Sequence, residues 1–218
     1  MKKAVVLLSG GVDSAVTLYL AKEEYECTAL IFDYGQKARE ELIAAGDLVA
    51  VAGVRKYLIK IDLARSGCAL LDSEVEIPKG LKVSADGKVP DTYVPARNMI
   101  FLSFAVSFAE TTGASAIFIG AHQLDYSNYP DCRAEFFESF NNMIKVGTKA
   151  GVDGREIRVI TPVIDMTKKE IVETGARLGV PFEHTWSCYE GGKTPCGECE
   201  SCLFRAEAFK KAGISVNG

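Results

Sequence analysis

The chain alternates short apolar runs, rich in β-branched residues, with longer amphipathic runs, and this alternation constrains the fold more than any other feature. It is typical of units in which parallel strands are joined by helices. The short runs predict strands at 4–8, 27–32, 56–61, 115–119 and 157–160. The longer runs predict helices at 14–24, 36–51, 97–112, 133–149, 167–178 and 201–211. We therefore expect an α/β fold with an open parallel sheet and helices on both of its faces.

The length of 218 residues suits one α/β domain with an appendage better than two full domains. The composition shifts to Cys, Gly and Glu near residue 181, so we place the main domain at 1–180 and a small C-terminal segment at 181–218. Residues 62–96 contain three prolines and show little periodicity. Because loops of this length are usually functional or disordered, we expect a mobile flap there.

Charge and hydropathy argue against nucleic acid and membranes as partners. With 25 Lys and Arg against 29 Asp and Glu, the net charge is −4, so we expect no broad basic surface for nucleic acid. The apolar stretch at 4–8 is too short for a secretory signal, and the apolar run at 99–109 is too short to cross a membrane. We expect a cytoplasmic protein that acts on small molecules.

Four of the seven cysteines lie close together near the C-terminus, at Cys188, Cys196, Cys199 and Cys202. In a reducing compartment such a group favours metal binding over disulfides. Four thiolates can complete a tetrahedral site and leave no position for substrate, so we expect a structural Zn²⁺. The tight spacing of the last three also leaves an iron–sulfur cluster open. His184, four residues before Cys188, is a competing ligand.

Residues 9–14 have the sequence Ser-Gly-Gly-Val-Asp-Ser, directly between the first predicted strand and the first predicted helix. A glycine-rich turn can present backbone amides to an anion there, and the helix N-terminus adds further donors. The segment is neither a Walker A motif nor a Gly-x-Gly-x-x-Gly turn. An ordinary turn in which Asp13 caps the helix is the alternative, but sheets of this kind bind ligands at the carboxyl ends of their strands. We therefore expect a phosphate loop.

Two further segments carry candidate binding residues. Arg97 and Asn98 open the apolar helix at 97–112, which we expect to be buried against the sheet, and the guanidinium of Arg97 could hold a carboxylate or a phosphate. After the fourth predicted strand, residues 120–133 crowd aspartates, tyrosines, an arginine and a cysteine into one loop. This composition suits recognition of a flat heterocycle, although polar loops are common.

Residues 9–14 resemble the pyrophosphate-binding loop of the N-type ATP pyrophosphatases, whose second strand ends beside adenine and ribose. The chain as a whole resembles the 7-cyano-7-deazaguanine synthase family of queuosine biosynthesis, on residues 9–14, 32–36, 94–98, 125–133, 186–189 and the terminal cysteines. The resemblance implies a Rossmann-like fold of the adenine nucleotide α-hydrolase type and a homodimer. Asn128 departs from it, because many members have glycine there, and so does Ala96, where some members have glycine.

The resemblance also implies a reaction, in which 7-carboxy-7-deazaguanine and ammonia become a nitrile through adenylated acid and amide intermediates. Free ammonium is the expected donor, because the chain is too short to include a glutaminase domain as well. A covalent role for the Cys132 thiol is possible but unnecessary once ATP activates the acid. A tRNA-thiolating or other amidating ATP pyrophosphatase, and a zinc-binding nucleotide sensor without catalysis, are the alternatives.

The site residues implied by the resemblance fall into three groups. We expect ATP, with Mg²⁺ beside Asp13, at Leu8, Ser9, Gly10, Gly11, Val12, Asp13, Ser14, Phe32, Tyr34 and Gln36. We expect the substrate base at Asn98, Tyr126, Tyr129 and Arg133. Catalytic roles are expected for Arg97, which steers the carboxylate or the α-phosphate, and for Asp125 and Asp131, which read the guanine-like edge or accept a proton.

Overall fold

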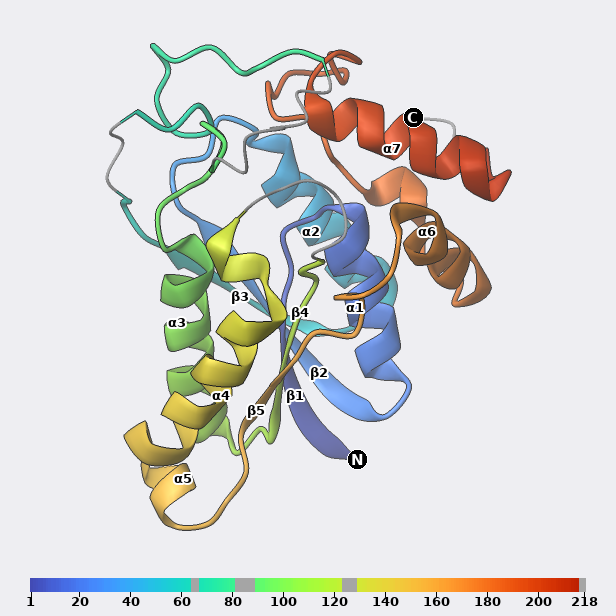
Figure 1. Cartoon of the computed structure of the whole chain (residues 1–218). Coiled ribbons are helices and arrows are strands. Elements are labelled where there is room, and N and C mark those ends of the chain that lie inside the picture. The colour runs from blue at the N-terminus through green and yellow to red at the C-terminus, as the bar shows by residue number, and fades with distance from the viewer. Residues whose placement is uncertain (64–66, 81–88, 123–128, 216–218) are drawn as a thin grey trace.

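The computed structural model describes residues 1–63, 67–80, 89–122 and 129–215 (Figure 1). Its sheet is entirely parallel, with the strand order β3-β2-β1-β4-β5. The strands are β1 (Lys2–Leu7), β2 (Tyr25–Asp33), β3 (Arg55–Lys60), β4 (Ala116–Ile119) and β5 (Arg158–Ile160). All five predicted strands are therefore confirmed, with small shifts at their ends, and so is the predicted fold class.

The helices of the described residues also follow the prediction, with two differences. They are α1 (Val12–Lys22), α2 (Glu40–Ala52), α3 (Arg97–Thr112), α4 (Ala134–Gly147), α5 (Lys149–Val152), α6 (Lys168–Arg177), α7 (Glu200–Ala212) and the 3-10 turns η1 (Pro130–Cys132) and η2 (Phe182–His184). The helix predicted at 133–149 stops at Gly147, because Thr148 is extended and caps α5. The helix predicted from residue 36 starts at Glu40, because the Gln36 side chain instead bonds the backbone of Phe32 and Tyr34.

Helices cover both faces of the sheet, as predicted (Figure 1). The helices α3 and α4 pack on the face that contains Val5 and Leu7, whereas α1, α2, α6 and α7 pack on the face that contains Ala4 and Val6. Alternate residues of a strand point to opposite faces, so a strand buried on both sides is apolar throughout. None of the helices in the described ranges is long and apolar enough to cross a membrane.

The helix α3 has one face buried against the sheet and one face partly exposed. It packs Phe101, Leu102 and Ala105 against the sheet, but Met99 and Phe104 are 47% and 42% exposed. The predicted burial of this helix against the sheet is therefore confirmed, and its outer face is partly exposed in the single chain. Its N-cap, Ala96, has a φ of 54°, the only positive φ of a non-glycine residue in the described ranges. A glycine would adopt this left-handed backbone without the strain that a Cβ causes.

The described parts of residues 62–96 and 181–215 pack against each other and against the sheet. Ala69 and Ile77 are buried in one cluster with Cys188 and Cys199. Phe209 of α7 contacts Phe182 with a ring distance of 5.0 Å, inside the core that α1 also forms. The C-terminal segment thus shares its core with the sheet domain. The boundary at residue 181 and the mobility of the flap, part of which falls outside the described residues, stay predictions.

Candidate active site

A cavity of about 290 Å³ lies at the carboxyl ends of β1, β2 and β4. The chain leaves β1 toward β2 and β3 and then returns to β4, so the strand order reverses between β1 and β4. Open α/β sheets bind their ligands at such a reversal. Of the predicted site residues, those that line the cavity are Leu8, Ser9, Gly11, Val12, Asp13, Ser14, Phe32, Tyr34, Gln36, Arg97, Asn98 and Tyr129.

The phosphate loop (residues 9–14) forms one wall of the cavity and is held by its own hydroxyl groups. The Ser14 hydroxyl donates to the Gly11 carbonyl at 2.9 Å and accepts from the Ser9 amide at 3.2 Å. Gly10 does not line the cavity, but its φ of +93° makes the turn possible. No side chain of the described residues caps α1, so the alternative role of Asp13 as a cap is wrong. Uncapped amides at a helix start favour an anion.

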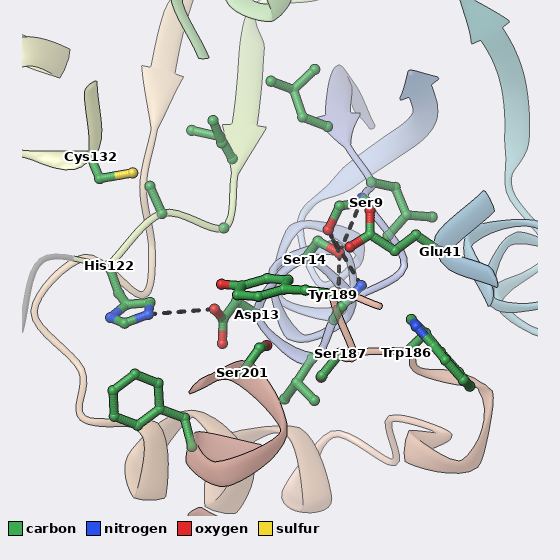
Figure 2. A pocket seen from close by; sticks show the side chains of 18 of the residues that line it. Ser9, Asp13, Ser14, Glu41, His122, Cys132, Trp186, Ser187, Tyr189 and Ser201 are labelled. Atoms are coloured by element: carbon green, nitrogen blue, oxygen red, sulfur yellow. Dashed lines mark hydrogen bonds and ion pairs between the residues drawn. The ribbon is translucent and has the colours of Figure 1, made fainter. Parts of the chain in front are cut away.

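Asp13 lies in an ion-pair network that the sequence did not reveal. Lys168 Nζ lies 2.7 Å from Asp13 Oδ2, and His122 Nε2 lies 3.6 Å from the same oxygen (Figure 2). Burial alone would raise the pKa of the Asp13 carboxyl, but the charges of Lys168 and His122 outweigh it and lower the pKa. Lys168 belongs to the capping-box run of α6, which the structure confirms between Thr167 and Glu170. The cavity thus contains an ionised carboxylate and an ammonium group beside the phosphate loop.

Arg97 enters the cavity from the first turn of α3. Its Nη1 lies 3.5 Å from the Tyr34 hydroxyl, and its guanidinium lies 6.0 Å from the centre of the Tyr34 ring. Burial raises the pKa of Tyr34 to about 12, so this hydroxyl stays protonated at neutral pH. Tyr129 is held nearby by a 2.6 Å hydrogen bond with Thr92. A partly buried guanidinium among neutral rings is suited to bind an anionic group of a ligand.

Asp131 has a different environment from the one expected. It is buried, it does not line the cavity, and its Oδ2 accepts the Asn98 amide at 3.0 Å. The Asn98 side chain donates back to the Asp131 carbonyl at 3.1 Å. Asp131 therefore caps the N-terminus of α3 from outside, and this geometry favours a positioning role over contact with the base. Because Arg97 opens α3, the contact fixes the start of the helix that carries it.

Other predicted residues lie elsewhere. Arg133 is exposed and does not line the cavity, so the structure does not bring it to the other site residues. Asp125 and Tyr126, like Asn128, lie outside the described residues. Cys132 lines the cavity, but burial raises the pKa of its thiol to about 11. A thiol that stays protonated is a poor nucleophile, which argues against the covalent alternative.

Sequence reasoning missed several cavity residues, because long-range packing brings them to the site. They are Glu41, Lys168, Trp186, Ser187, Tyr189, Glu200, Ser201, Phe204 and Arg205. Gly120 and His122, which also line the cavity, belong to the predicted binding segment 120–133. The Trp186 amide donates to the Gly10 carbonyl at 2.9 Å, so the C-terminal segment is tied to the phosphate loop. Only the resemblance at 186–189 pointed to part of this group. No local motif of the sequence marked Glu41 or Arg205.

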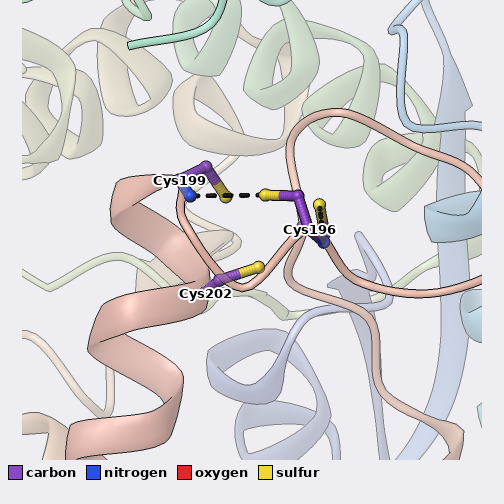
Figure 3. A group of neighbouring side chains, drawn as sticks. Cys196, Cys199 and Cys202 are labelled. Atoms are coloured by element: carbon purple, nitrogen blue, oxygen red, sulfur yellow. Dashed lines mark hydrogen bonds between the residues drawn. The ribbon is translucent and has the colours of Figure 1, made fainter. Parts of the chain in front are cut away.

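The four predicted metal ligands form one group, three of which are labelled in Figure 3. The sulfur atoms of Cys188, Cys196, Cys199 and Cys202 lie within 4.8 Å of one another. Thiolates on one tetrahedral ion, each about 2.3 Å from it, would lie about 3.8 Å apart, so the group fits a single ion after a small contraction. The amides of Cys196 and Cys199 donate to the sulfurs of Cys188 and Cys196, both at 3.3 Å. His184 is not a member of the group.

The four-cysteine cluster also holds the long loop. Lys79 pairs with Cys199 in an isolated antiparallel bridge, and the Gly80 amide donates to the Glu198 carbonyl at 2.9 Å. Lys79 Nζ lies 2.8 Å from Glu198 Oε2. The cysteines therefore connect residues 62–96 to the C-terminal segment, and Trp186 connects that segment to the phosphate loop.

The parallel sheet, the glycine-rich loop after β1 and the cavity at the strand reversal define an α/β fold of the PP-loop type. The solved structure of NMN synthetase from Francisella tularensis has a similar fold, with a TM-score of 0.50 and 19% identity, over 100% of this chain and 79% of that one. A model of the family of queuosine biosynthesis protein QueC matches residues 3–213. The chain belongs to this family.

Curated relatives are similar over nearly the whole length. The 7-cyano-7-deazaguanine synthase 2 of Desulfitobacterium hafniense (strain Y51) is 47% identical over 98% of this chain and 91% of its own. The 7-cyano-7-deazaguanine synthase of Trichodesmium erythraeum is 45% identical over 98% of both chains. That of Clostridium kluyveri is 48% identical over 98% of this chain and 95% of its own.

Proposed function

We propose that this chain is a 7-cyano-7-deazaguanine synthase, an ATP-dependent carbon–nitrogen ligase that converts 7-carboxy-7-deazaguanine and ammonia to the nitrile. Family membership supports the overall reaction. The structural observation that carries the proposal is a single cavity in which the phosphate loop and the guanidinium of Arg97 face the same space. Such a cavity can hold a nucleotide and an acid together. Transfer of AMP from one to the other requires this proximity.

The chemistry requires activation twice. A carboxylate resists attack by ammonia, because both its charge and its oxide leaving group oppose the reaction. Transfer of AMP to a carboxylate oxygen releases pyrophosphate and gives a mixed anhydride, which ammonia opens to the amide. A second AMP on the amide oxygen allows that oxygen to leave, and the nitrile remains. In this scheme the chain acts by positioning and by charge stabilisation, with the loop amides on the phosphates and Arg97 on the carboxylate or the α-phosphate.

Mg²⁺ fits the same wall of the cavity. The ion takes oxygen ligands and is commonly held by one or two carboxylates together with substrate phosphates. Asp13 offers an ionised carboxylate within the phosphate loop, and the ion would neutralise charge on the phosphates. Lys168 occupies this carboxylate and would compete with the ion for it or bind a phosphate itself. Asp13 is the residue we assign to the ion.

The proposed metal of the four-cysteine cluster is Zn²⁺ with a structural role. A single ion places all four sulfurs close together, as they are here, whereas a four-iron cluster puts each thiolate on a different iron atom and holds the sulfurs farther apart. Four protein ligands leave no position for substrate, so the ion would fix the C-terminal segment and the long loop beside the cavity.

Purified protein is expected to contain about one zinc ion per chain, measured by plasma mass spectrometry. Changing Cys202 to serine should remove the zinc and lower the Tm by about 10 °C or more, because the ion joins three segments of the chain. The variant Cys27→Ala, which changes a buried cysteine outside the cluster, should keep the zinc. Iron with inorganic sulfide in place of zinc would contradict the assignment.

We also propose a homodimer that covers the outer face of α3 and the edge strand β3. Met99, Phe104 and Tyr57 are each between 42% and 50% exposed there, and Tyr57 contacts Phe108 of α3 with a ring distance of 4.8 Å. Apolar groups of this size on one face favour an interface. Light scattering should give twice the mass of the chain, and Phe104→Glu should shift the mass toward the monomer. A monomeric parent protein would contradict the proposal.

The direct test of the function is incubation with ATP, Mg²⁺, ammonium and 7-carboxy-7-deazaguanine, with mass spectrometry of both the base and the nucleotide. We expect the nitrile together with AMP, with no nucleic acid in the mixture. In the cell, we propose that the reaction takes place in the cytoplasm. The nitrile with ADP would keep the function but replace adenylation by phosphorylation. An unchanged base would reject the function and favour a different acid, a tRNA-thiolating ATPase or a nucleotide sensor.

A further inference from the structure

Glu41 lines the cavity, and neither the phosphate-binding nor the carboxylate-binding role described above uses it. We propose that Glu41 is the ammonium site of the cavity: its carboxylate binds the ammonium ion and takes one proton from it, which releases ammonia beside the activated acid. This inference rests on the proposed function, because it assigns the entry of the nitrogen substrate to a residue of the same site.

The position of Glu41 is the first argument. It lies in the first turn of α2, and its backbone carbonyl lies so close to Gly10 that a Cβ added there would collide with it. Its side chain is directed into the cavity on the side of Ser9 and Ser14 (Figure 2). The charge of Arg97 acts on the same carboxyl. If the loop holds the phosphates and Arg97 holds the acid, the carbon that ammonia attacks lies beside Glu41.

The charges in the cavity are the second argument. ATP and the carboxylate substrate are both anions, so an ionised Glu41 would repel them unless a cation came with them. Ammonium is the cation among the proposed substrates. Arg97 of α3, Tyr34 after β2 and Tyr189 of the C-terminal segment line the same cavity as Glu41, and the charge of Arg97 acts on its carboxyl. The two rings could also contact a cation. The cavity thus contains an anionic group together with a guanidinium and two aromatic rings.

The acidity of Glu41 suits proton transfer. Burial raises the pKa of this carboxyl to about 7, although the charge of Arg97 opposes the shift. A group with a pKa near the working pH is ionised often enough to accept a proton and acidic enough to lose it again. Most exposed glutamates are too weak as bases for this task. The environment therefore supports the role that the position of Glu41 suggests.

The other carboxylates of the cavity are less suited to this role. Asp13 is bound by Lys168 and His122, and Glu200 lies next to the metal ligand Cys199. A carboxylate could instead read the N–H edge of the deazaguanine ring. That edge lies on the six-membered ring, away from the carboxyl group at position 7, whereas Glu41 lies near Arg97. The geometry thus favours ammonium over the ring edge.

The proposed reaction of ammonium is a proton transfer followed by an acyl transfer. Ammonium gives one proton to the Glu41 carboxylate, which leaves neutral ammonia and a neutral carboxyl group. The nitrogen lone pair then forms a bond to the acyl carbon, and the carbon–oxygen bond to AMP breaks with its electron pair on AMP. The attached nitrogen loses its surplus proton to water and the amide results. Glu41 returns its own proton to water before the next ammonium ion binds.

Replacement of Glu41 by glutamine tests the proposal through the choice of nucleophile. Hydroxylamine is mostly uncharged at neutral pH, so it needs no base before it attacks the adenylate. We expect E41Q to lose about 100-fold or more of the ammonium-dependent turnover, in line with general base catalysis, but to form the hydroxamate within about threefold of the parent rate. With ammonium, the E41Q rate should rise about tenfold per pH unit near neutrality, because free ammonia increases in that proportion.

Two controls accompany this test. Asp47→Asn removes a charge from the exposed side of α2 and should leave both rates unchanged, and Glu41→Asp should keep part of the ammonium rate. Pyrophosphate exchange into ATP, dependent on the acid and measured without ammonium, should persist in E41Q. Equal losses with ammonium and hydroxylamine, or full ammonium turnover in E41Q, would overturn the proposal. Absence of the exchange in the parent protein would reject the proposed function itself.

Discussion

Replacing Arg97 by alanine should lower kcat/KM for nitrile formation by about 10³-fold, with little loss of folding stability. The guanidinium is partly buried and lies 3.5 Å from the Tyr34 hydroxyl. It enters the cavity in front of the phosphate loop from α3. A fixed positive group beside the negative charge that develops in the transition state commonly raises the rate by two to three powers of ten, which corresponds to roughly 3–4 kcal/mol. Steady-state kinetics with mass spectrometric detection of the nitrile measures the effect.

Two further variants separate charge from geometry. Arg97→Lys keeps the charge but loses the planar fork, so we expect it to recover only part of the activity, about tenfold above the alanine variant. Arg133→Ala should remain close to the parent, because Arg133 is exposed and outside the cavity. If Arg97→Ala retained parental turnover, or if Arg133→Ala lost as much, the assignment of the acid-binding group would be wrong.

Replacing Gly10 by alanine should destabilise the protein by about 3 kcal/mol or more and abolish nucleotide binding. The backbone of Gly10 has a φ of +93°, which strains any L side chain, and a Cβ would collide with the Glu41 carbonyl and lie 3.0 Å from the Ala45 nitrogen. Both neighbours are backbone atoms of α2, which cannot move without displacing the helix. Urea unfolding and ATP binding measured by calorimetry report the two effects separately.

Gly53→Ala is the matched control for this prediction. Gly53 also has a positive φ, of +67°, but nothing lies within 4 Å of the position of its Cβ. The substitution should therefore show the cost of backbone strain alone, about 1–2 kcal/mol, and leave nucleotide binding intact. A Gly10→Ala protein as stable as Gly53→Ala would mean that α2 does not press on the phosphate loop as the structure shows.

The fold could be predicted because local signals determine it. Buried parallel strands must be apolar on both faces, so runs such as residues 4–8 and 27–32 stand out without any knowledge of their neighbours. The phosphate loop and the four cysteines likewise have short and specific spacings. Each of these predictions needed only residues that lie close together in the sequence.

The rest of the site depends on contacts between distant segments. Lys168 reaches Asp13 across 155 positions of the sequence, and Glu41 reaches the cavity because α2 packs against Gly10. The sequence around Lys168 predicted only the start of a helix, and the structure confirms that start. Asp131 shows the same dependence on packing: its sequence position predicted contact with substrate or proton transfer, and only the structure reveals that its carboxylate also holds the start of α3. Polar residues reveal their partners only when the packing is known.

The central claim is that both oxygen atoms of the substrate carboxylate leave on AMP, activated in one cavity by the phosphate loop and Arg97. It is tested most directly with 7-carboxy-7-deazaguanine whose carboxylate carries ¹⁸O at both oxygens, incubated with the protein, ATP, Mg²⁺ and ammonium. We predict that mass spectrometry will find one ¹⁸O in each AMP formed, none in pyrophosphate and none in the nitrile. Label in inorganic phosphate or in water, with unlabelled AMP, would contradict the account.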